Sequence, residues 1–355
     1  MSLLITGATG FIGRHLCTRL TTDQHTVLAL LRDPDRQLPR LREQVEALGG
    51  DGKRIHALYG DLDQPGLGID TPPADITAII HLGARFAWQL DRDSARRTNV
   101  AGSLAVAELA ARLGCRLVFI SGFMLENHEH LQRLGIHTHA PAQTRWEDVY
   151  RRAGGYEASK LEAAFAVRAL AESRGLELVE VQPATVAGHS QSGDLDPAQP
   201  LYSLMDNLAR GRLALIPGTP DHWLPLVAVD HLAALITRAA TTEQPPTRLL
   251  ALDPQTPPLH ELLARLAPPL GRKAPRRFIP IGLLSALLRL PGLPRLMNTW
   301  PEALHFIQPT RFDTRISEDF AAAQGLVAPP MARVIHASAH CYANQGHIRA
   351  QPRPA

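Results

Sequence analysis

The sequence has little of what marks secreted, membrane or nucleic-acid-binding proteins. Its three cysteines, Cys17, Cys115 and Cys341, are scattered without metal-ligand spacing and cannot all pair, which suits a reducing compartment. No apolar run approaches the length of a membrane span, and an apolar strand expected from residue 2 leaves no room for a signal peptide. The formal net charge of +3 is small for 355 residues and implies no nucleic-acid or membrane-surface partner. We therefore expect a cytoplasmic protein whose partner is a small-molecule substrate or another protein.

Apolar residues make up 45% of the chain and recur in short runs that alternate with helical or polar segments. Such alternation predicts parallel strands joined by helices. The runs that we interpret as strands are 3–5, 26–31, 55–59, 76–80, 116–121, 178–182 and 248–252. Long helices are expected over 92–113 and 156–173, and a further helix near 226–240 with Asp230 as its cap.

A glycine-rich turn follows the first strand directly, and an amphipathic helix follows the turn. Dinucleotide sites need this order, because the glycines let the backbone approach a pyrophosphate that lies at the positive end of the helix. An ordinary tight turn is the alternative interpretation. The candidate cofactor residues in this turn are Thr6, Gly7, Thr9, Gly10, Phe11, Ile12 and Gly13.

These patterns predict an α/β fold, a Rossmann-type doubly wound parallel sheet with a smaller C-terminal substrate lobe. We expect residues 1–189 to form the nucleotide-binding domain, with 226–255 returning to it, and residues 190–225 and 256–344 to form the lobe. The polar residues 345–355 are expected to be a disordered tail. Within the lobe, the leucine-rich stretch 278–300 favours either a wall for a lipid-like or polyketide-like substrate or an ordinary helical core.

Tyr156 and Lys160 lie four residues apart in a predicted helix, so their side chains share one face of it. A nearby ammonium favours the phenolate and lowers the pKa of a tyrosine from its usual value near ~10. Chance spacing is the default interpretation for an isolated pair. Behind a glycine turn, however, the pair indicates an acid–base site with Tyr156 as the proton donor.

At these residues the chain resembles the extended short-chain dehydrogenases/reductases, most closely the acyl-thioester or fatty-acyl reductase and dihydroflavonol reductase-like branches. The resemblance covers about residues 2 to 240. Beyond the glycine turn and the Tyr156–Lys160 pair, it rests on Gly60-Asp61-Leu62, His81-Leu82-Gly83-Ala84, Asn99-Val100-Ala101-Gly102, the strand-end Ser121 and Gln182-Pro183.

The resemblance implies the roles of further residues. It places Asp61 and Leu62 against an adenine, and it places Leu82, Gly83 and Ala84 along the cofactor channel. Pro183 would lie by the nicotinamide, with Asn99, Tyr156, Lys160 and Val186 also contacting the cofactor. The catalytic residues would be Tyr156, Lys160, Ser121 and Asn99, although support of its own helix is an equally good role for Asn99. Members of the family also often form homodimers through the two helices expected here over 92–113 and 156–173.

Two positions depart from the family pattern. The family usually has a serine or threonine one residue past Ser121, where this chain has Gly122 followed by Phe123. Ser121 either substitutes for that hydroxyl or is a structural serine at the end of a strand. The second departure is Gln182, which stands where the family commonly has arginine, and this weakens the case for an anionic substrate.

Arg32 indicates which nicotinamide cofactor is preferred. NAD enzymes place an acid at this distance from the glycine turn, whereas an arginine accommodates a 2′-phosphate. Asp33 keeps NAD(H) possible, but we expect NADP(H). The histidine pairs of His128-Glu129-His130 and His137-Thr138-His139 lack the i, i+4 spacing of a helical zinc site, so we expect a variable polar loop and no metal.

The sequence therefore predicts an NADPH-dependent reductase of a ketone, an aldehyde or an acyl thioester. The first alternative is a nucleotide-sugar epimerase or dehydratase that retains NAD. It is disfavoured because Gly122 and Phe123 offer no acid or base beside the strand-end hydroxyl. The second alternative is a non-catalytic NADP-binding sensor, which would have no need of the proton donor Tyr156.

Overall fold

The computed structural model describes residues 1–71 and 73–350, without the side chains of 346–350. The chain forms two compact units. The first consists of Met1–Pro183, Leu232–Ala251 and Ile316–Leu326, and the second of Ala184–His231, Leu252–Arg315 and Val327–Ala355. This division differs from the expected one, since the first segment ends at Pro183 rather than residue 189. Residues 316–326, which we expected in the lobe, also belong to the first unit.

A seven-stranded parallel sheet forms the centre of the first unit. Its strands are β1 (Ser2–Thr6), β2 (Thr26–Leu31), β3 (Ile55–Tyr59), β4 (Ile76–His81), β5 (Arg116–Ile120), β6 (Leu178–Pro183) and β10 (Arg248–Ala251). They lie in the order β10-β6-β5-β4-β1-β2-β3, with the direction of winding reversed at β1. This arrangement confirms the predicted α/β fold with a doubly wound sheet. In such sheets, ligands bind at the carboxyl ends of the strands near the reversal.

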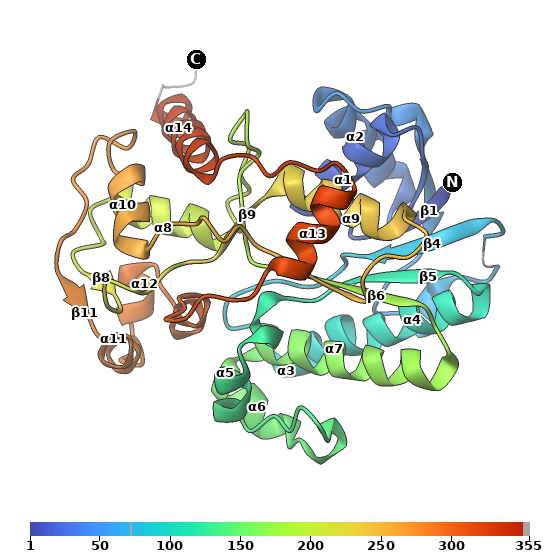
Figure 1. Ribbon diagram of the computed structural model, residues 1–355, viewed down its shortest axis with the longest axis horizontal. Coiled ribbons are helices and arrows are strands. Elements are labelled where there is room, and N and C mark those ends of the chain that lie inside the picture. The colour runs from blue at the N-terminus through green and yellow to red at the C-terminus, as the bar shows by residue number, and fades with distance from the viewer. Residues whose placement is uncertain (72, 351–355) are drawn as a thin grey trace. The chain divides into compact units, whose positions relative to one another are not determined.

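Helices cover both faces of this sheet (Figure 1). The helices α1 (Phe11–Thr22), α2 (Pro34–Ala47) and α9 (Val229–Thr241) lie on one face, and α4 (Gly102–Leu113) and α7 (Gly155–Arg174) lie on the other. A cluster of buried side chains fills the layer between the sheet and the helices α4 and α7; among its completely buried members are Ile79, Leu117, Leu109 and Val167. The shorter elements of this unit are η1 (Gly52–Arg54), η2 (Pro65–Gly68), η4 (Phe123–Glu126) and α13 (Arg315–Ala323).

The alanines of α4 and α7 pack within the chain itself. Ala107, Ala110, Ala163 and Ala164 are completely buried, and Ala105, Ala111 and Ala166 are half-buried. Small side chains let two helices approach closely, so the alanine pattern is explained by contact between α4 and α7. The expected homodimer through these helices stays a prediction.

The helix expected over 92–113 begins as α3 (Arg92–Ala95), continues through a π-helical turn η3 (Arg96–Ala101) and ends as α4. The backbone stays helical across both junctions, at Arg96 and at Ala101–Gly102. A π turn inserts one extra residue per turn and is frequent at functional sites. Here it contains Asn99.

The segment between η4 and α7 is helical, so the expected polar loop was wrong. It contains α5 (His128–Leu134), η5 (Pro141–Gln143) and α6 (Trp146–Ala153). The side chain of Asn127 caps α5 by accepting a hydrogen bond from the His130 amide at 3.0 Å. Both helices bury apolar residues, for example Leu131 and Val149. The polar composition was misleading because most of the polar residues lie on the outer faces of these helices.

The second unit has two small sheets and several helices. The strands β7 (Thr185–Ala187) and β9 (Leu226–Ala228) form one parallel pair, and β8 (Ile216–Pro217) and β11 (Phe278–Ile279) form the other. Its helices are α8 (Pro200–Ala209), α10 (Leu259–Leu266), α11 (Ile281–Leu287), α12 (Leu293–Met297), η6 (Pro301–Phe306) and α14 (Met331–Ala350). The expected disordered tail differs from the structure, because α14 continues through residues 345–350; residues 351–355 lie outside the described range.

The structure tests two predictions in this unit, the role of Asp230 as a helix cap and the burial of the leucine-rich stretch 278–300. Asp230 is not the cap of α9, because it lies in the first turn, where its carboxylate accepts hydrogen bonds from the Ser190 amide and hydroxyl. The leucine-rich stretch divides its side chains between core and surface. Leu284 and Leu288 are buried, whereas Leu283, Leu290 and Leu296 are more than half exposed.

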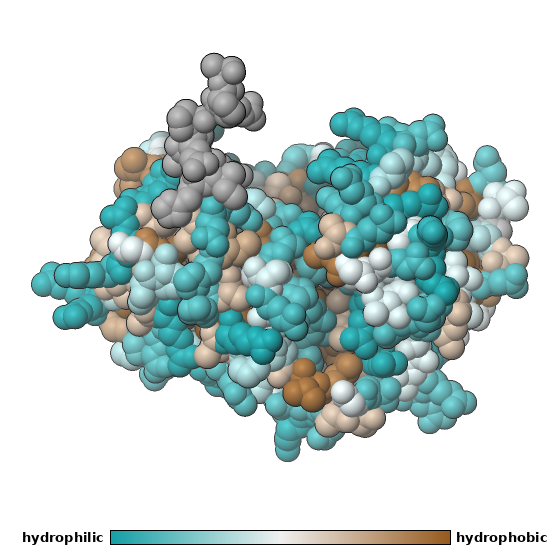
Figure 2. Space-filling view, turned by 90° about the horizontal axis from the view of Figure 1, so that it is seen from above, coloured by the Kyte–Doolittle hydropathy of each residue, from teal (hydrophilic) through white to brown (hydrophobic). Residues whose placement is uncertain are grey.

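The face shown in Figure 2 is mostly hydrophilic, with apolar residues in small separate groups. Among the described residues, no helix is both long enough and apolar enough to cross a membrane.

Candidate active site

The glycine turn brings the end of β1 against the end of β4. Gly7 has φ +73°, and a Cβ atom added there would lie 2.8 Å from the amide nitrogen of Gly83. A Cβ atom at Gly13 would lie 2.2 Å from the carbonyl oxygen of Gly7. The helix α1 begins after Gly10 with no side-chain cap among the described residues, and Thr9 and Gly10 are exposed. The first amides of α1 are therefore open to an anion, so this turn fits the pyrophosphate of a dinucleotide.

A buried chain of hydrogen bonds stabilises this turn. The hydroxyl of Thr6 accepts the Gly83 amide at 3.0 Å and lies 2.6 Å from Nδ1 of His81. On the other side of the ring, Nε2 lies 2.8 Å from the hydroxyl of Ser103, which itself donates to the carbonyl of Asn99. Because the Ser103 hydroxyl donates to Asn99, it accepts a hydrogen bond from Nε2 of His81, and Nδ1 accepts one from Thr6. His81 is therefore neutral, with its proton on Nε2. In agreement, burial and then the charge of Lys160 lower the pKa of His81 to about 3.

The candidate adenine and ribose residues lie just past the carboxyl ends of β2 and β3. Arg32 is exposed just past the end of β2, where its guanidinium is free to meet a phosphate. The carboxylate of Asp33 caps α2 by accepting the Arg36 amide at 3.2 Å. Asp61 accepts the amide of Asp63 at 3.0 Å, and a Cβ atom at Gly83 would lie 2.7 Å from the Leu62 side chain.

Six further candidates lie at the ends of strands β4 and β6, in strand β7 and at the start of helix α1. Leu82 is half-buried and Ala84 is exposed at the carboxyl end of β4, and Pro183 is half-buried at the end of β6. Val186 lies buried in β7 of the second unit, and is not among the residues that the first unit brings together. Phe11 and Ile12 begin α1.

Asn99 connects the loop after β4 to the helix α7. Its side-chain amide group accepts the Arg85 amide at 2.7 Å and donates to the Arg85 carbonyl at 3.1 Å. It also donates to the hydroxyl of Ser159 at 2.9 Å, and Ser159 donates to the carbonyl of Tyr156. Of the two roles considered for Asn99, these contacts support a structural one.

Tyr156 and Lys160 lie one turn apart near the start of α7, and both are half-buried. The ring of Tyr156 meets that of Phe86 edge to face, with centroids 4.5 Å apart. The ammonium of Lys160 donates to the carbonyl of Ile120, the last residue of β5, at 2.6 Å, and lies 5.2 Å from the ring centre of Phe119. Lys160 therefore contacts the carboxyl end of β5, and Tyr156 contacts the loop that follows β4.

The pKa of Tyr156 differs from the expectation. Burial, with a contribution from the Glu157 carboxylate, raises it to about 12, whereas we expected Lys160 to lower it. Both causes act in the same direction, since the loss of hydration and the nearby carboxylate each disfavour the phenolate. Burial also lowers the pKa of Lys160 to about 8, although the carboxylate of Glu180 opposes this change.

Ser121 is buried, and its hydroxyl donates to Oε1 of Glu180 at 2.5 Å. In this structure the hydroxyl proton of Ser121 is therefore hydrogen-bonded to Glu180. Gly122, at the usual family position, has an extended backbone, and a Cβ atom added there would meet open space. Glu180 and His81 are the groups whose roles the sequence analysis missed; a charged residue in an otherwise apolar strand was the signal for Glu180.

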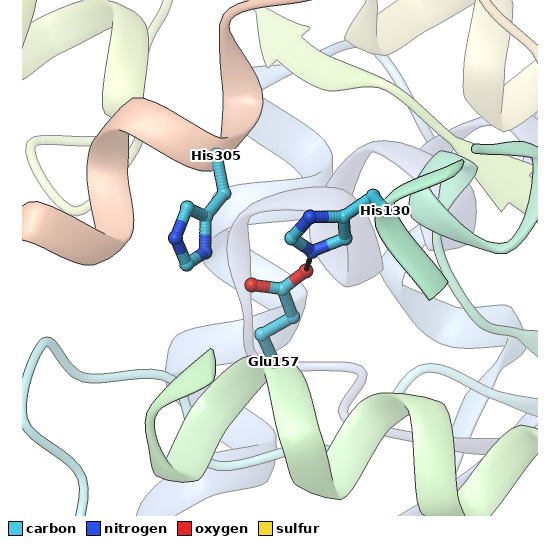
Figure 3. A group of neighbouring side chains, drawn as sticks. All are labelled: His130, Glu157 and His305. Carbon is cyan, nitrogen blue, oxygen red and sulfur yellow. Dashed lines mark hydrogen bonds and ion pairs between the residues drawn. The ribbon is translucent and has the colours of Figure 1, made fainter. Parts of the chain in front are cut away.

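His130 and Glu157 form a second buried pair, with Nε2 2.6 Å from Oε1 (Figure 3). They come from α5 and α7, and Glu157 is the neighbour of Tyr156 in the sequence. His305, also labelled in Figure 3, belongs to the second unit. Of the four histidines in 128–130 and 137–139, His130 thus helps to attach α5 to α7.

A family model of NAD-binding domains, described as male sterility protein, matches residues 5–236. The chain belongs to this family of extended short-chain dehydrogenases/reductases. The predicted resemblance is confirmed, and the chain is an NAD(P)-dependent oxidoreductase with a nicotinamide cofactor.

Similar proteins include much longer ones. The chain is 30% identical over 252 residues to a PKS-NRPS hybrid synthetase of Chaetomium globosum, an alignment that covers 66% of this chain and 5% of the synthetase. It is 28% identical over 294 residues to an aldehyde reductase of Aspergillus flavus, covering 71% of this chain and 26% of that protein. The chain therefore spans only a fraction of these relatives.

A similar solved structure is the terminal R domain from the myxalamid PKS-NRPS biosynthetic pathway. It matches with a TM-score of 0.76 and 21% identity, and covers 99% of this chain and 92% of that domain. At this identity the likeness shows the fold.

Proposed function

We propose that the chain is an NADPH-dependent reductase of a carbonyl group, namely a ketone, an aldehyde or an acyl thioester, on a hydrophobic or secondary-metabolite-like substrate. The observation that carries the proposal is the Tyr156–Lys160 pair on α7, with Lys160 bonded to the carboxyl end of β5, in the same unit as an uncapped glycine turn. Relatives named as an aldehyde reductase and as PKS-NRPS synthetases support the substrate class.

Reduction of a carbonyl needs a hydride on its carbon and a proton on its oxygen. A reduced nicotinamide, when bound, would supply a hydride to the carbonyl carbon. Tyr156, which its high pKa keeps protonated, gives the hydroxyl proton to the carbonyl oxygen, so a ketone or aldehyde becomes an alcohol. For an acyl thioester, release of the thiol leaves an aldehyde. The ammonium of Lys160 stabilises the phenolate that remains on Tyr156.

The assignment of NADPH rests on Arg32 and Asp33. Because the Asp33 carboxylate caps α2, it is engaged away from a ribose hydroxyl, while the exposed Arg32 guanidinium can pair with a 2′-phosphate. We expect Arg32→Ala to weaken NADPH binding by about 10- to 100-fold, the loss of one charged hydrogen-bonding partner, and to leave NADH binding nearly unchanged. Fluorescence titration of both cofactors measures this. Equal weakening of both would contradict the assignment, and Arg36→Ala is the matched control.

The pH dependence of turnover follows from Lys160. Its pKa of about 8 means that the ammonium is present below that pH and is lost above it. We therefore expect kcat/KM for carbonyl reduction to be level below pH ~8 and to fall about tenfold per pH unit above it, because a neutral amine does not stabilise the phenolate. A profile measured from pH 6 to 10 tests this, and a level profile up to pH 10 would refute it.

The test of the proposed function as a whole combines cofactor binding with turnover. Purified protein is titrated with NADPH and NADH, and NADPH oxidation is then followed with aldehydes, ketones and acyl thioesters of increasing chain length. Tight NADPH binding and turnover of one class support the reductase. Co-purified NAD together with a failure to bind NADPH would overturn it in favour of an epimerase-like activity, and NADPH binding without any turnover would favour a sensor.

A further inference from the structure

A buried carboxylate that the chemistry above does not use lies beside the candidate catalytic groups. Glu180 is in β6 within the seven-stranded sheet, and only 1% of its surface is exposed. A carboxylate buried to this extent costs several kcal/mol of hydration energy unless it is paired and hydrogen-bonded. The partners of Glu180 therefore show what holds the charge in place.

Each carboxylate oxygen of Glu180 has a strong partner. The Ser121 hydroxyl donates to Oε1 at 2.5 Å, and Nε of Arg168 donates to Oε2 at 2.7 Å. The side-chain amide of Gln182 adds a longer contact to Oε1 at 3.5 Å. Arg168 lies eight residues beyond Lys160 on α7, about two turns along the same side of the helix. The carboxylate is thus held in one orientation by the helix that carries the catalytic pair.

The register of the sheet places Glu180 in the same row as groups that surround Lys160. The row passes from His81 on β4 through Phe119 on β5 to Glu180 on β6. Lys160 lies over the middle member, 5.2 Å from the ring centre of Phe119. The titratable groups around its ammonium are the neutral His81, the carboxylate of Glu180 and the phenol of Tyr156 one turn earlier.

We propose that Glu180 is a positioning residue of the active site, which accepts the hydrogen bond of the Ser121 hydroxyl and provides a fixed negative charge next to Lys160. This inference rests on the proposed function. It explains how the chain works without the usual family hydroxyl at residue 122: Ser121 does not replace it, and Tyr156 alone donates to the carbonyl oxygen. In support, the Glu180 carboxylate opposes the effect of burial on the pKa of Lys160.

The lysine content makes a direct measurement possible. The sequence has three lysines, Lys53, Lys160 and Lys273. Protein grown with lysine labelled at Cε with carbon-13 gives three side-chain signals, and the Lys160 signal is assigned by its loss in Lys160→Arg. Titration of these signals gives the pKa of Lys160 without cofactor or substrate. Lys53 and Lys273 are exposed and act as internal references.

Two variants should move the pKa of Lys160 in opposite directions. Glu180→Gln removes the negative charge and leaves Arg168, so we expect the pKa to fall by about one unit. Arg168→Gln leaves the carboxylate without its main counter-charge, so we expect the pKa to rise. The side chain of Arg168 is 29% exposed, and Arg168→Gln is an independent variant that tests the proposal even if Glu180→Gln does not fold. If Glu180 only stabilised the fold, the two variants would not shift the pKa of Lys160 in opposite directions.

The kinetic counterpart separates this inference from the proposed function. In the Glu180→Gln variant the fall of kcat/KM at high pH should begin about one unit lower than in the wild type, and Glu180→Asp should restore it. Unchanged Lys160 titration in folded variants, or a shift of the same sign in both, overturns the role of Glu180. If the Lys160 shifts occur as expected while no carbonyl is reduced, the proposed function fails and the electrostatic role of Glu180 stands.

Discussion

Tyr156→Phe should lower kcat for carbonyl reduction by about 10²- to 10⁴-fold, the usual contribution of a proton donor, and leave the NADPH dissociation constant within a few-fold of the wild type. The substitution removes only the hydroxyl. The aromatic ring keeps its edge-to-face contact with Phe86, so the packing of α7 is preserved. Steady-state kinetics and fluorescence titration of the same preparation separate the two effects.

A second tyrosine provides the control for this experiment. Tyr150 lies in α6, is buried, and donates its hydroxyl to Glu162 at 2.8 Å. Tyr150→Phe removes a buried tyrosine hydroxyl that has no part in the proposed chemistry, so it should cost about 1 kcal/mol of stability and leave kcat within about twofold. Turnover of Tyr156→Phe within tenfold of the wild type would mean that another group donates the proton.

The sheet could be predicted from the sequence because each of its strands is a short apolar run. A strand buried on both faces leaves a continuous run such as Thr26–Leu31, and the turn Thr6 to Gly13 orders strand and helix around it. Those signals are local in the sequence. The helices α5 and α6 failed to stand out because their polar outer faces dominate the composition of the segment.

The site could be predicted only in part, since its groups act through contacts between distant segments. The spacing of Tyr156 and Lys160 is local and was recognised from the sequence. The contact of Ser121 with Glu180 joins two strands, and it decides where the serine proton goes. Likewise, the raised pKa of Tyr156 follows from burial, which a spacing rule does not contain.

Gly155 is the clearest case of a residue whose importance is invisible in the sequence. It is the first residue of α7, immediately before Tyr156, and it is buried. A Cβ atom added there would lie 2.0 Å from the carbonyl oxygen of Leu90, a backbone atom that cannot rotate away. The start of the catalytic helix is therefore packed directly against the loop that follows β4, which Asn99 also ties to α7 through Arg85 and Ser159.

Gly155→Ala should lower the free energy of unfolding by about 1–3 kcal/mol, the typical cost of forcing extra atoms into a packed site, and should reduce turnover as well. The loop must move to admit the methyl group, and it carries Phe86, which packs on Tyr156. Thermal unfolding measures the first effect, and amide hydrogen exchange over residues 84–91 locates it. Gly122→Ala is the matched control, because its methyl group would meet open space on an extended backbone. If both variants unfold at the wild-type temperature and residues 84–91 exchange at the wild-type rate, the close contact between Gly155 and Leu90 does not constrain the catalytic helix.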